Sequence, residues 1–476
     1  MVPEPRPYRH QPFDRSEKLY FLKAGLLVLA LYFFRRAAAG IAFLAWLLVP
    51  ALFLSFVWFK SIRTGDRLID VLREHVTFIP IARTEGGRKS FVPWATLALI
   101  LANAAMFYAM RLLSPVDRGT IENALCFLPP EPIRGISLLS PIASMFLHAD
   151  AGHLWGNMAF LWAFAPAVEE RIGPRRFLLL YLATGLIGHT GSIVIWRLFF
   201  RSALFSLGAS GAVAGVMGIF MVRCYFKKLV IPVPLAGLLS VKLKVSSLPV
   251  LGLFFVSDLH GGVRHLQGDM SNIGYWTHVG SMAAGFALAV LLRLHAKAAE
   301  EKFTEQGLAA MGSEFGRRAS IDSLQAALRL NPDNEAALLG LAREYAITRR
   351  PEGRELFQRV IALEIGANPD QAMAAYGECR TSYGPGLESG LQYRLAGVFY
   401  RKGEHEPAAR LLEALVAEPS APDGTRQRAF FQLVVLLAEN NMLEAAHYRL
   451  RQFRELYPAS PLLQAAEDKL VDVLKS

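Results

Sequence analysis

Long apolar runs alternate with short polar connectors over the first three hundred residues of the chain. After residue 90, six apolar segments follow one another, at 91–112, 153–168, 177–196, 206–222, 245–259 and 274–292. In lipid a backbone amide must bond within its own segment, so each run predicts a helix. Several runs are shorter than the roughly 20 residues that cross a bilayer. We therefore predict a helix bundle in which some helices are sheltered from lipid.

Two more apolar runs, Ala24–Phe34 and Ala37–Phe59, precede these six and are separated by Arg35 and Arg36. The first run is too short to cross alone, because about 20 residues are needed. The pair fits either an interfacial helix followed by a span or a tight hairpin, and both remain open. No small-residue cleavage site follows the first run, so we expect no cleaved signal peptide.

The connectors fall into two sets that differ in basic charge. The first set (60–89, 169–176, 223–244 and 293–302) carries 18 Lys and Arg residues, and the second (113–152, 197–205 and 257–273) carries five. Basic loops remain in the cytoplasm, so the segments beginning at 153, 206 and 274 should run inward from the outer face. This asymmetry explains the net charge of +11 without a nucleic-acid partner. It favours a bacterial inner membrane.

From about residue 300 the pattern becomes amphipathic and helical, and each unit ends near a proline: Pro332, Pro369, Pro419 or Pro458. The stretch YRLAGVFYRKGEHEPAARLLEALVAEP resembles a tetratricopeptide (TPR) repeat, although the proline spacing is looser than in a regular array. We therefore expect a soluble α-helical TPR-like domain, with an ordinary helical bundle as the alternative. Such repeats present extended surfaces, so a protein partner is expected here.

The predicted fold class is therefore all-α: a polytopic membrane helix bundle followed by a soluble helical repeat domain. The expected divisions are N-terminal hydrophobic segments with a basic linker at 1–90, a membrane core at 91–295, a linker at 296–318 and a cytoplasmic repeat domain at 319–476. Three cysteines, Cys126, Cys224 and Cys379, lie too far apart to suggest a disulfide framework or a metal cluster.

A serine, Ser210, stands between glycines in SLGASGAVAGVMG, near the start of an inward-running segment. Its glycines could simply form a small-residue packing face. However, His278 in YWTHVGSMAAGF also lies near the start of an inward-running segment. Ionisable residues inside membrane segments are functional candidates by default.

The third inward-running segment begins HADAGHLWGNMAF, in which His153 and Asn157 share one helix face. Topology thus brings Ser210, His278, His153 and Asn157 to a similar depth. A serine needs a neighbouring base to become a nucleophile, and acyl transfer needs donors for an oxyanion. We predict Ser210 as nucleophile, His278 as base, and His153, Asn157 and the Ser210 N–H as oxyanion donors. No acidic residue is expected at this depth, so a Ser–His dyad is predicted.

Over residues 91–295 these motifs resemble the rhomboid family of intramembrane serine proteases. Gly208, Ser210 and Gly211 match its G-x-S-G, and His153 with Asn157 matches its H-x-x-x-N. The remaining matches are His278 followed by Gly280 and Gly285, Glu169 in AVEERIG at the end of the second core helix, and His148 just before that helix.

The resemblance implies a six-helix core with a water-filled cavity that opens outward, and cleavage of transmembrane protein substrates in the bilayer. It implies that the fifth helix, with Phe254 and Phe255, is a gate, and that the loop 257–273 is a cap with hinges at Gly261 and Gly262. No metal or organic cofactor is expected. Three departures are Ala214 where some members carry tyrosine, Ser281 where glycine is frequent, and the absence of a Trp-Arg pair in 113–140.

Two other functions are possible from the pattern. A rhomboid-like pseudoprotease would bind client helices without cutting them. A transporter would require broken helices and a midplane charge, and neither is evident. Among the remaining histidines, His189 is expected to have a packing or hydrogen-bonding role, and His260 and His265 are expected in a solvated loop rather than at a metal.

Overall fold

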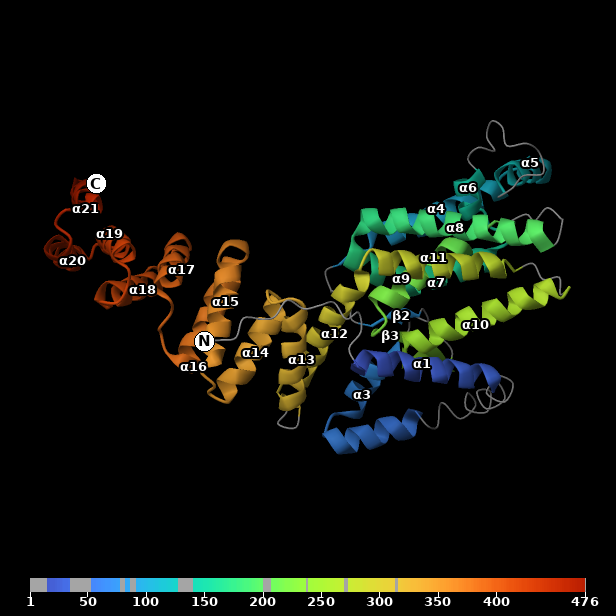
Figure 1. The fold of residues 1–476 in the computed structure, drawn as a ribbon, viewed down its shortest axis with the longest axis horizontal. Coiled ribbons are helices and arrows are strands. Elements are labelled where there is room, and N and C mark those ends of the chain that lie inside the picture. Colours follow the sequence, from blue (N-terminus) through green and yellow to red (C-terminus); the bar gives the residue numbers. More distant parts are fainter. Residues whose placement is uncertain are drawn as a thin grey trace. The chain divides into compact units, whose positions relative to one another are not determined.

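A computed structural model describes residues 15–34, 53–77, 82–85, 91–126, 140–199, 207–236, 239–268, 273–312 and 316–475. The chain is mainly helical, as predicted, and divides into two compact units between Ala298 and Ala299 (Figure 1). Each unit is described by itself.

All six segments predicted for the membrane core are helical. They form α4 (Trp94–Arg111), α7 (Ala151–Ile172), α8 (Pro174–Phe199), α9 (Ser210–Arg223), α10 (Ser247–Leu266) and α11 (Tyr275–Leu291). Helix α9 is the centre of this unit, because it contacts α7, α8, α10 and α11 and nearly all its residues are buried. A helix with 14 residues is too short to cross a bilayer alone, and here its neighbours surround it.

Among the described helices, only α4 and residues 174–195 of α8 are long and apolar enough to cross a membrane singly. Helix α11 qualifies only when it is taken together with α12 (Leu294–Ala310), across a bend between them. These spans and the rhomboid motifs make this an integral membrane protein. The 14 residues of α9, surrounded by other helices, agree with the prediction that part of the bundle is sheltered.

The N-terminal residues add helices outside this group of six. Helix α1 (Arg15–Phe33) packs along α10, where the Tyr20 hydroxyl lies 2.9 Å from Ser246 Oγ. Residues 53–64 are helical and are followed by α3 (Leu68–His75). Residues 35–52 lie outside the described part of the chain, so the choice between a hairpin and an interfacial helix stays open.

Between α4 and α7 lie α5 (Pro115–Leu125), α6 (Ser140–Ala143) and the 3₁₀ turn η2 (Ser144–Phe146). The connector from α9 to α10 contains strands that the apolar pattern did not predict. A four-stranded antiparallel sheet runs in the order β1-β4-β3-β2, with β1 at Val76–Thr77, β2 at Arg83–Thr84, β3 at Lys228–Ala236 and β4 at Leu239–Ser246. The connector is therefore a β-hairpin completed by two short strands from the N-terminal region.

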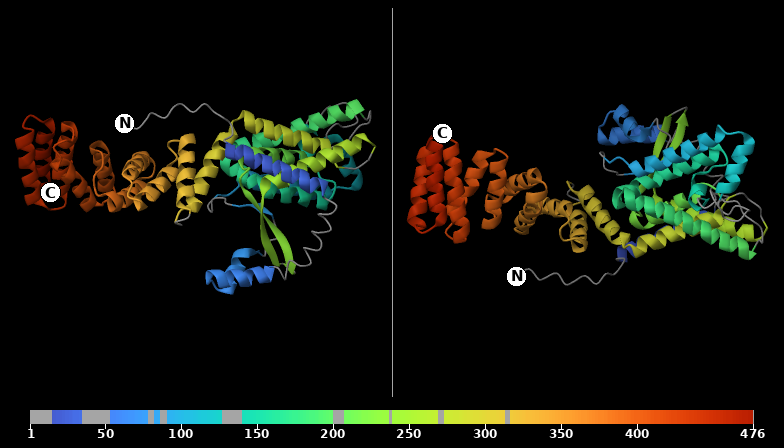
Figure 2. Two further views of the ribbon diagram at one scale, coloured as in Figure 1. Left: turned by 60° about the horizontal axis from the view of Figure 1, so that its bottom comes forward. Right: turned by 90° about the horizontal axis from the view of Figure 1, so that it is seen from above.

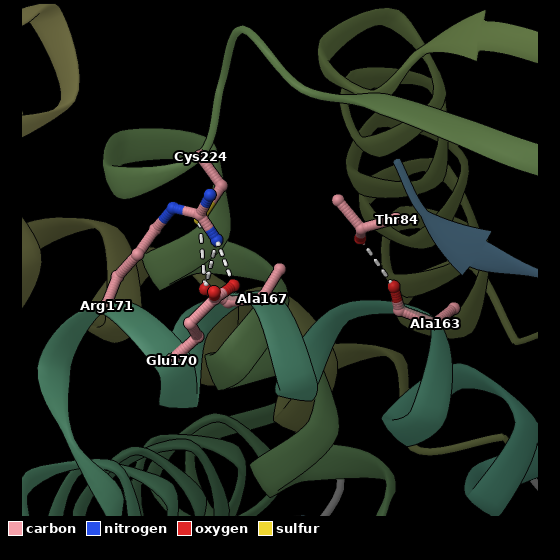
Figure 3. A network of polar contacts seen from close by, with 6 residues as sticks. All are labelled: Thr84, Ala163, Ala167, Glu170, Arg171 and Cys224. Carbon is pink, nitrogen blue, oxygen red and sulfur yellow. Dashed lines mark hydrogen bonds and ion pairs between the residues drawn. The ribbon is translucent and has the colours of Figure 1, made fainter. Parts of the chain in front are cut away.

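Polar contacts fasten the sheet and the end of α9 to α7 (Figure 3). The Thr84 hydroxyl on β2 donates to the Ala163 carbonyl at 2.7 Å. Four residues further along α7, the Ala167 carbonyl accepts from Arg171 Nη1 at 2.8 Å and from Cys224 Sγ at 3.7 Å. This end of α7 is thus held from two sides, which fixes the helix that carries His153 and Asn157.

Glu169 joins α7 to α4. Its carboxylate is 1% exposed and accepts the backbone N–H groups of Ala95 and Thr96 at 2.8 Å each, and the Thr96 hydroxyl at 2.6 Å. The first N–H groups of a helix have no partner within it, and a negative charge is favourable there. Glu169 therefore caps α4 from another helix, a structural role for the acid that the resemblance singled out.

The second unit contains the helices α13 (Arg317–Leu330), α14 (Glu335–Ile347), α15 (Glu352–Ala367), α16 (Pro369–Tyr383), α17 (Ser389–Arg401), α18 (His405–Ala417), α19 (Asp423–Glu439), α20 (Leu443–Leu456) and α21 (Pro461–Lys475). Figure 2 shows them following one another, with sequence neighbours packed together. The four prolines that ended each predicted unit all lie at or between helix ends. Helix α12 occupies part of the range 296–318 where a linker was expected. The TPR-like repeat itself remains a prediction.

Candidate active site

The turn before α9 is shaped by a glycine in the left-handed region. Gly208 has φ of +121°, and a Cβ there would lie 2.8 Å from His153 Cε1. Its N–H donates to the Ser144 carbonyl at 2.8 Å. A side chain would be strained and would collide with the imidazole, so glycine is required. The turn delivers Ser210 to the first position of α9, where the backbone N–H has no partner within the helix.

The side chains near the start of α7 form a connected polar group. Asp150 caps the helix by accepting the His153 N–H at 2.8 Å. Asn157 Nδ2 donates to His148 Nε2 at 3.1 Å, and the His148 and His153 rings pack edge to face with centroids 5.1 Å apart. Because an amide nitrogen carries two hydrogens, one remains for another acceptor. His153 and Asn157 therefore meet next to Gly208, and His148 contacts both.

Glycines set the register between α9 and α11. A Cβ on Gly285 would collide with the Gly215 carbonyl, so the two backbones are in contact there. Nearer the helix starts, a Cβ on Gly211 would meet Thr277 Cγ2 at 2.8 Å. Parallel helices paired in this way bring Ser210 and His278 to the same level. Among the described residues no hydrogen bond joins the Ser210 hydroxyl to the His278 ring, an arrangement common before substrate binds.

Gly280 and two residues that depart from the rhomboid pattern, Ala214 and Ser281, lie in helices α9 and α11. Gly280 faces Gly188 of α8, with 3.4 Å from its Cβ position to the Gly188 Cα. Ser281 is fully buried and Ala214 is 2% exposed. His189 Nδ1 bonds to the Gly185 carbonyl at 2.8 Å, so the prediction of a hydrogen-bonding role for this histidine is confirmed.

The expectation that no acidic side chain reaches the candidate base is wrong. His278 Nδ1 lies 3.0 Å from Asp258 Oδ2, and both side chains are only 13% exposed. The Phe254 ring covers the imidazole, with centroids 6.2 Å apart. Sequence reasoning missed Asp258 because it placed this residue in the polar loop 257–273.

Helix α10 in fact continues to Leu266, so Gly261 and Gly262 are helical positions and not hinges in a loop. A Cβ on Gly261 would lie 2.6 Å from the Tyr275 ring, and one on Gly262 would lie 2.9 Å from Trp276. His265, expected in solvent, is 3% exposed and packs on Tyr275. His260 is also helical and packs on Tyr32. Residues 269–272 of the predicted cap lie outside the described residues.

A signal for this helix was present in the sequence. The buried residues of α10 include Leu251, Asp258, Gly262 and His265, at spacings of seven, four and three. These are the intervals of one helix face. The same spacing continues into the polar stretch after residue 257 that resembled a loop. Following the period, rather than the change of composition, predicts that Asp258 faces the bundle.

Comparison with known proteins matches residues 137–295 to the Rhomboid domain family. The rhomboid-family protein YdcA of Bacillus subtilis (strain 168) is 38% identical over 90 residues, which is 19% of this chain and 42% of that protein. RHOMBOID-like protein 6, mitochondrial, of Arabidopsis thaliana is 23% identical over 269 residues, 50% of this chain and 79% of that protein. Rhomboid protease GluP of Bacillus subtilis (strain 168) is 43% identical over 81 residues, 17% of this chain and 14% of that protein.

Proposed function

Residues 137–295 of this chain form a rhomboid domain, and on that premise we propose that the protein is an intramembrane serine endopeptidase. It cleaves membrane proteins within or beside their transmembrane helices. The observation that carries the proposal is the meeting of the His153 and Asn157 side chains with Gly208, two residues before Ser210.

In the proposed reaction, Ser210 Oγ attacks the scissile carbonyl while His278 accepts its proton. The negative charge on the tetrahedral intermediate is stabilised by the Asn157 amide, an N–H of His153 and the backbone N–H of Ser210. His278 then donates the proton to the leaving amine. Water, activated by the same base, hydrolyses the acyl ester and regenerates the hydroxyl of Ser210.

A pseudoprotease that only binds client helices is the rival proposal. The serine, the histidine and the amide needed for acyl transfer are all in the chain, which favours the protease. A fluorophosphonate probe separates the two, because it reacts only with an activated serine. We expect labelling of wild-type protein and none of Ser210→Ala or His278→Ala, with both variants still folded in detergent. If wild-type protein neither reacts with the probe nor cuts a model transmembrane substrate, the pseudoprotease proposal is favoured instead.

For the second unit we propose a protein partner with an acidic segment. A pocket of 560 Å³ lies between the alternate helices α15, α17 and α19, and it is lined by Tyr393, Arg394, Arg401 and Phe431. A neighbouring pocket of 690 Å³ shares Tyr393 and Arg394, and its lining also holds Arg359 and Arg428 together with Glu355 and Glu388. Aromatic rings with arginines fit a carboxylate-bearing chain, because guanidinium pairs with carboxylates in two-point geometry.

Charge reversal tests this surface. We expect Arg394→Glu with Arg401→Glu to abolish binding of glutamate-rich peptides to the full chain, measured by fluorescence anisotropy. Arg318→Glu, an exposed arginine on α13 outside both pockets, is the matched control and should bind as wild type. Equal binding by both variants would remove the pocket from the proposal. Fluorophosphonate labelling of Ser210 should be the same in all three.

The distribution of basic connectors supports a bacterial inner membrane as the location of the protein. It also supports a cytoplasmic location for the second unit. Fusion of a reporter active only in the cytoplasm after residue 476 tests this orientation. If this fusion is inactive and a reporter that works only outside the cytoplasm is active at the same position, the proposed direction of every helix is wrong. Ser210 would then lie near the opposite face of the membrane.

A further inference from the structure

A carboxylate inside an apolar helix bundle needs an explanation, because burying an unpaired charge is costly. Asp258 lies in α10, one turn after Phe254, and its side chain is 13% exposed. Its partner is His278 Nδ1 of α11 at 3.0 Å. Intramembrane acids of this kind are functional candidates by default.

The contact determines which nitrogen of His278 carries the proton. A carboxylate only accepts hydrogen bonds, so a neutral imidazole paired with it must hold its proton on Nδ1. The other nitrogen, Nε2, then presents a lone pair, which is the form that can take a proton from a serine hydroxyl. When Nε2 becomes protonated, the carboxylate also stabilises the resulting positive ring.

Packing on both sides of α10 holds Asp258 in place. On one side, Gly261 and Gly262 lie against the Tyr275 and Trp276 rings at the start of α11. On the other side, Val28 of α1 lies against Gly252, 2.8 Å from its Cβ position. The contact between Asp258 and His278 is thus built by three helices, and it depends on how α10 packs on α11.

From this geometry we propose that Asp258 is a positioning residue that keeps the proton of His278 on Nδ1 and leaves Nε2 free for Ser210. The candidate dyad thereby becomes a Ser–His–Asp set assembled from α9, α11 and α10. This inference rests on the proposed protease function. The competing explanation is that the pair only ties α10 to α11, with no effect on the chemistry of the base.

Two substitutions separate these explanations. Asp258→Asn keeps the size and can still hydrogen-bond, so a purely structural tie survives it. Its NH₂ group can, however, donate to Nδ1 and favour the tautomer with the proton on Nε2, which cannot accept from Ser210. Asp258→Glu restores an acceptor-only group on a longer stem and should recover much of the loss. The exposed neighbour Ser257→Ala is the matched control on the same helix.

The measurements are the rate of fluorophosphonate labelling, and kcat and KM for a model transmembrane substrate, on full-length protein in detergent. For Asp258→Asn we expect labelling and kcat to fall at least about 10-fold with KM unchanged, below the roughly 10⁴-fold seen for a fully buried triad. Ser257→Ala should match wild type.

Asp258→Asn with wild-type labelling and kcat would overturn the inference and leave the protease proposal standing. So would an equal loss in Asp258→Asn and Asp258→Glu. If wild-type protein itself neither labels nor cleaves, the protease proposal fails and this inference fails with it. The melting temperature of each variant in detergent separates both of these results from misfolding.

Discussion

Two glycines of the first unit that meet backbone carbonyls differ from two glycines of the second unit that meet side chains. In the membrane unit, Gly285 meets the Gly215 carbonyl, and Gly218 meets the Met282 carbonyl, so helix backbones touch. In the second unit, the close neighbours of Gly307 and Gly340 are the side chains of leucines. Helices in lipid gain little from burying apolar side chains and associate through close backbone packing. Contacts with large apolar side chains, such as these leucines, are the kind that burial away from water stabilises.

Buried polar groups of the first unit can be set against exposed ion pairs of the second, although the second unit also buries Glu344 and Glu364. The membrane unit buries Glu169, His189 and Asp258 between helices. In the second unit the described ion pairs include exposed ones, such as Arg343 with Glu378 at 2.7 Å and Arg410 with Glu406 at 2.8 Å. Exposed pairs contribute little to stability. The comparison therefore predicts that small changes at buried contacts of the first unit have larger effects than similar changes in the second.

The largest expected effect comes from Gly285→Ala. The added methyl group collides with the Gly215 carbonyl, so α9 and α11 must separate and take Ser210 away from His278. We expect loss of detectable cleavage and of fluorophosphonate labelling, and a melting temperature in detergent well below wild type.

Two glycines with nothing within 4 Å of a Cβ are its matched controls, Gly191 in α8 and Gly377 in α16. Changing either to alanine should alter stability by no more than about 1 kcal/mol, the intrinsic helix preference. Activity like wild type in Gly285→Ala would contradict the view that backbone contact sets the site.

Asn157→Ala should have the next largest effect. It removes one proposed oxyanion donor and the bond to His148, so cleavage should fall by about 10²–10³, as for other single donors of this kind. The fall should appear in kcat, because the oxyanion forms only in the transition state. A change confined to KM would instead indicate a role in substrate binding.

The architecture of the first unit follows from the apolar pattern, and its site only partly does. The apolar runs predict six helices with their order and direction. These in turn predict the similar depth of Ser210, His153 and Asn157 in the membrane. Asp258 was missed because local composition was weighed above periodicity: polar residues and adjacent glycines resembled a loop. The β-hairpin was missed because residues 223–244 resembled a basic connector between helices. Glycines that contact aromatic rings of another helix cannot be told from turn glycines without knowing the partner helix.

A smaller effect is expected from removing a helix cap, and Glu169 and Asn368 allow its cost in stability to be compared between the two units. Glu169 is a buried cap supplied by another helix, and its loss leaves the donors at the start of α4 unsatisfied. Glu169→Ala should therefore cost about 2–4 kcal/mol of unfolding free energy. Asn368 is an exposed local cap that accepts the Gln371 N–H at 3.4 Å, so Asn368→Ala should cost about 0.5–1 kcal/mol. Chemical denaturation of each full-length variant measures both, and equal costs would contradict the comparison.

The last prediction, smaller in effect than Glu169→Ala, concerns a carboxyl group in the second unit. Glu364 of α15 is 2% exposed. A hydrogen bond with Glu335, burial and the charge of Glu335 together raise the pKa of Glu364 from 4.5 to about 7. The folded state therefore binds more protons at Glu364 than the unfolded state does between these values. The stability that Glu364 contributes is fully present below pH 4.5 and is lost as the pH rises through 7.

Glu364→Gln keeps the hydrogen-bonding shape without a titrating group, and it should remove this slope. At pH 8 we expect the variant to be more stable than wild type by about 1 kcal/mol, or about 2–4 °C in melting temperature. Pulse proteolysis of the second unit in urea, on full-length protein between pH 4 and 8, measures the difference. Because Glu364 is far in sequence from every proposed catalytic residue, fluorophosphonate labelling of Ser210 should not change. A variant that loses stability at pH 8 would mean that the carboxyl of Glu364 is ionised and stabilising there, and that this unit, like the first, depends on a buried charge.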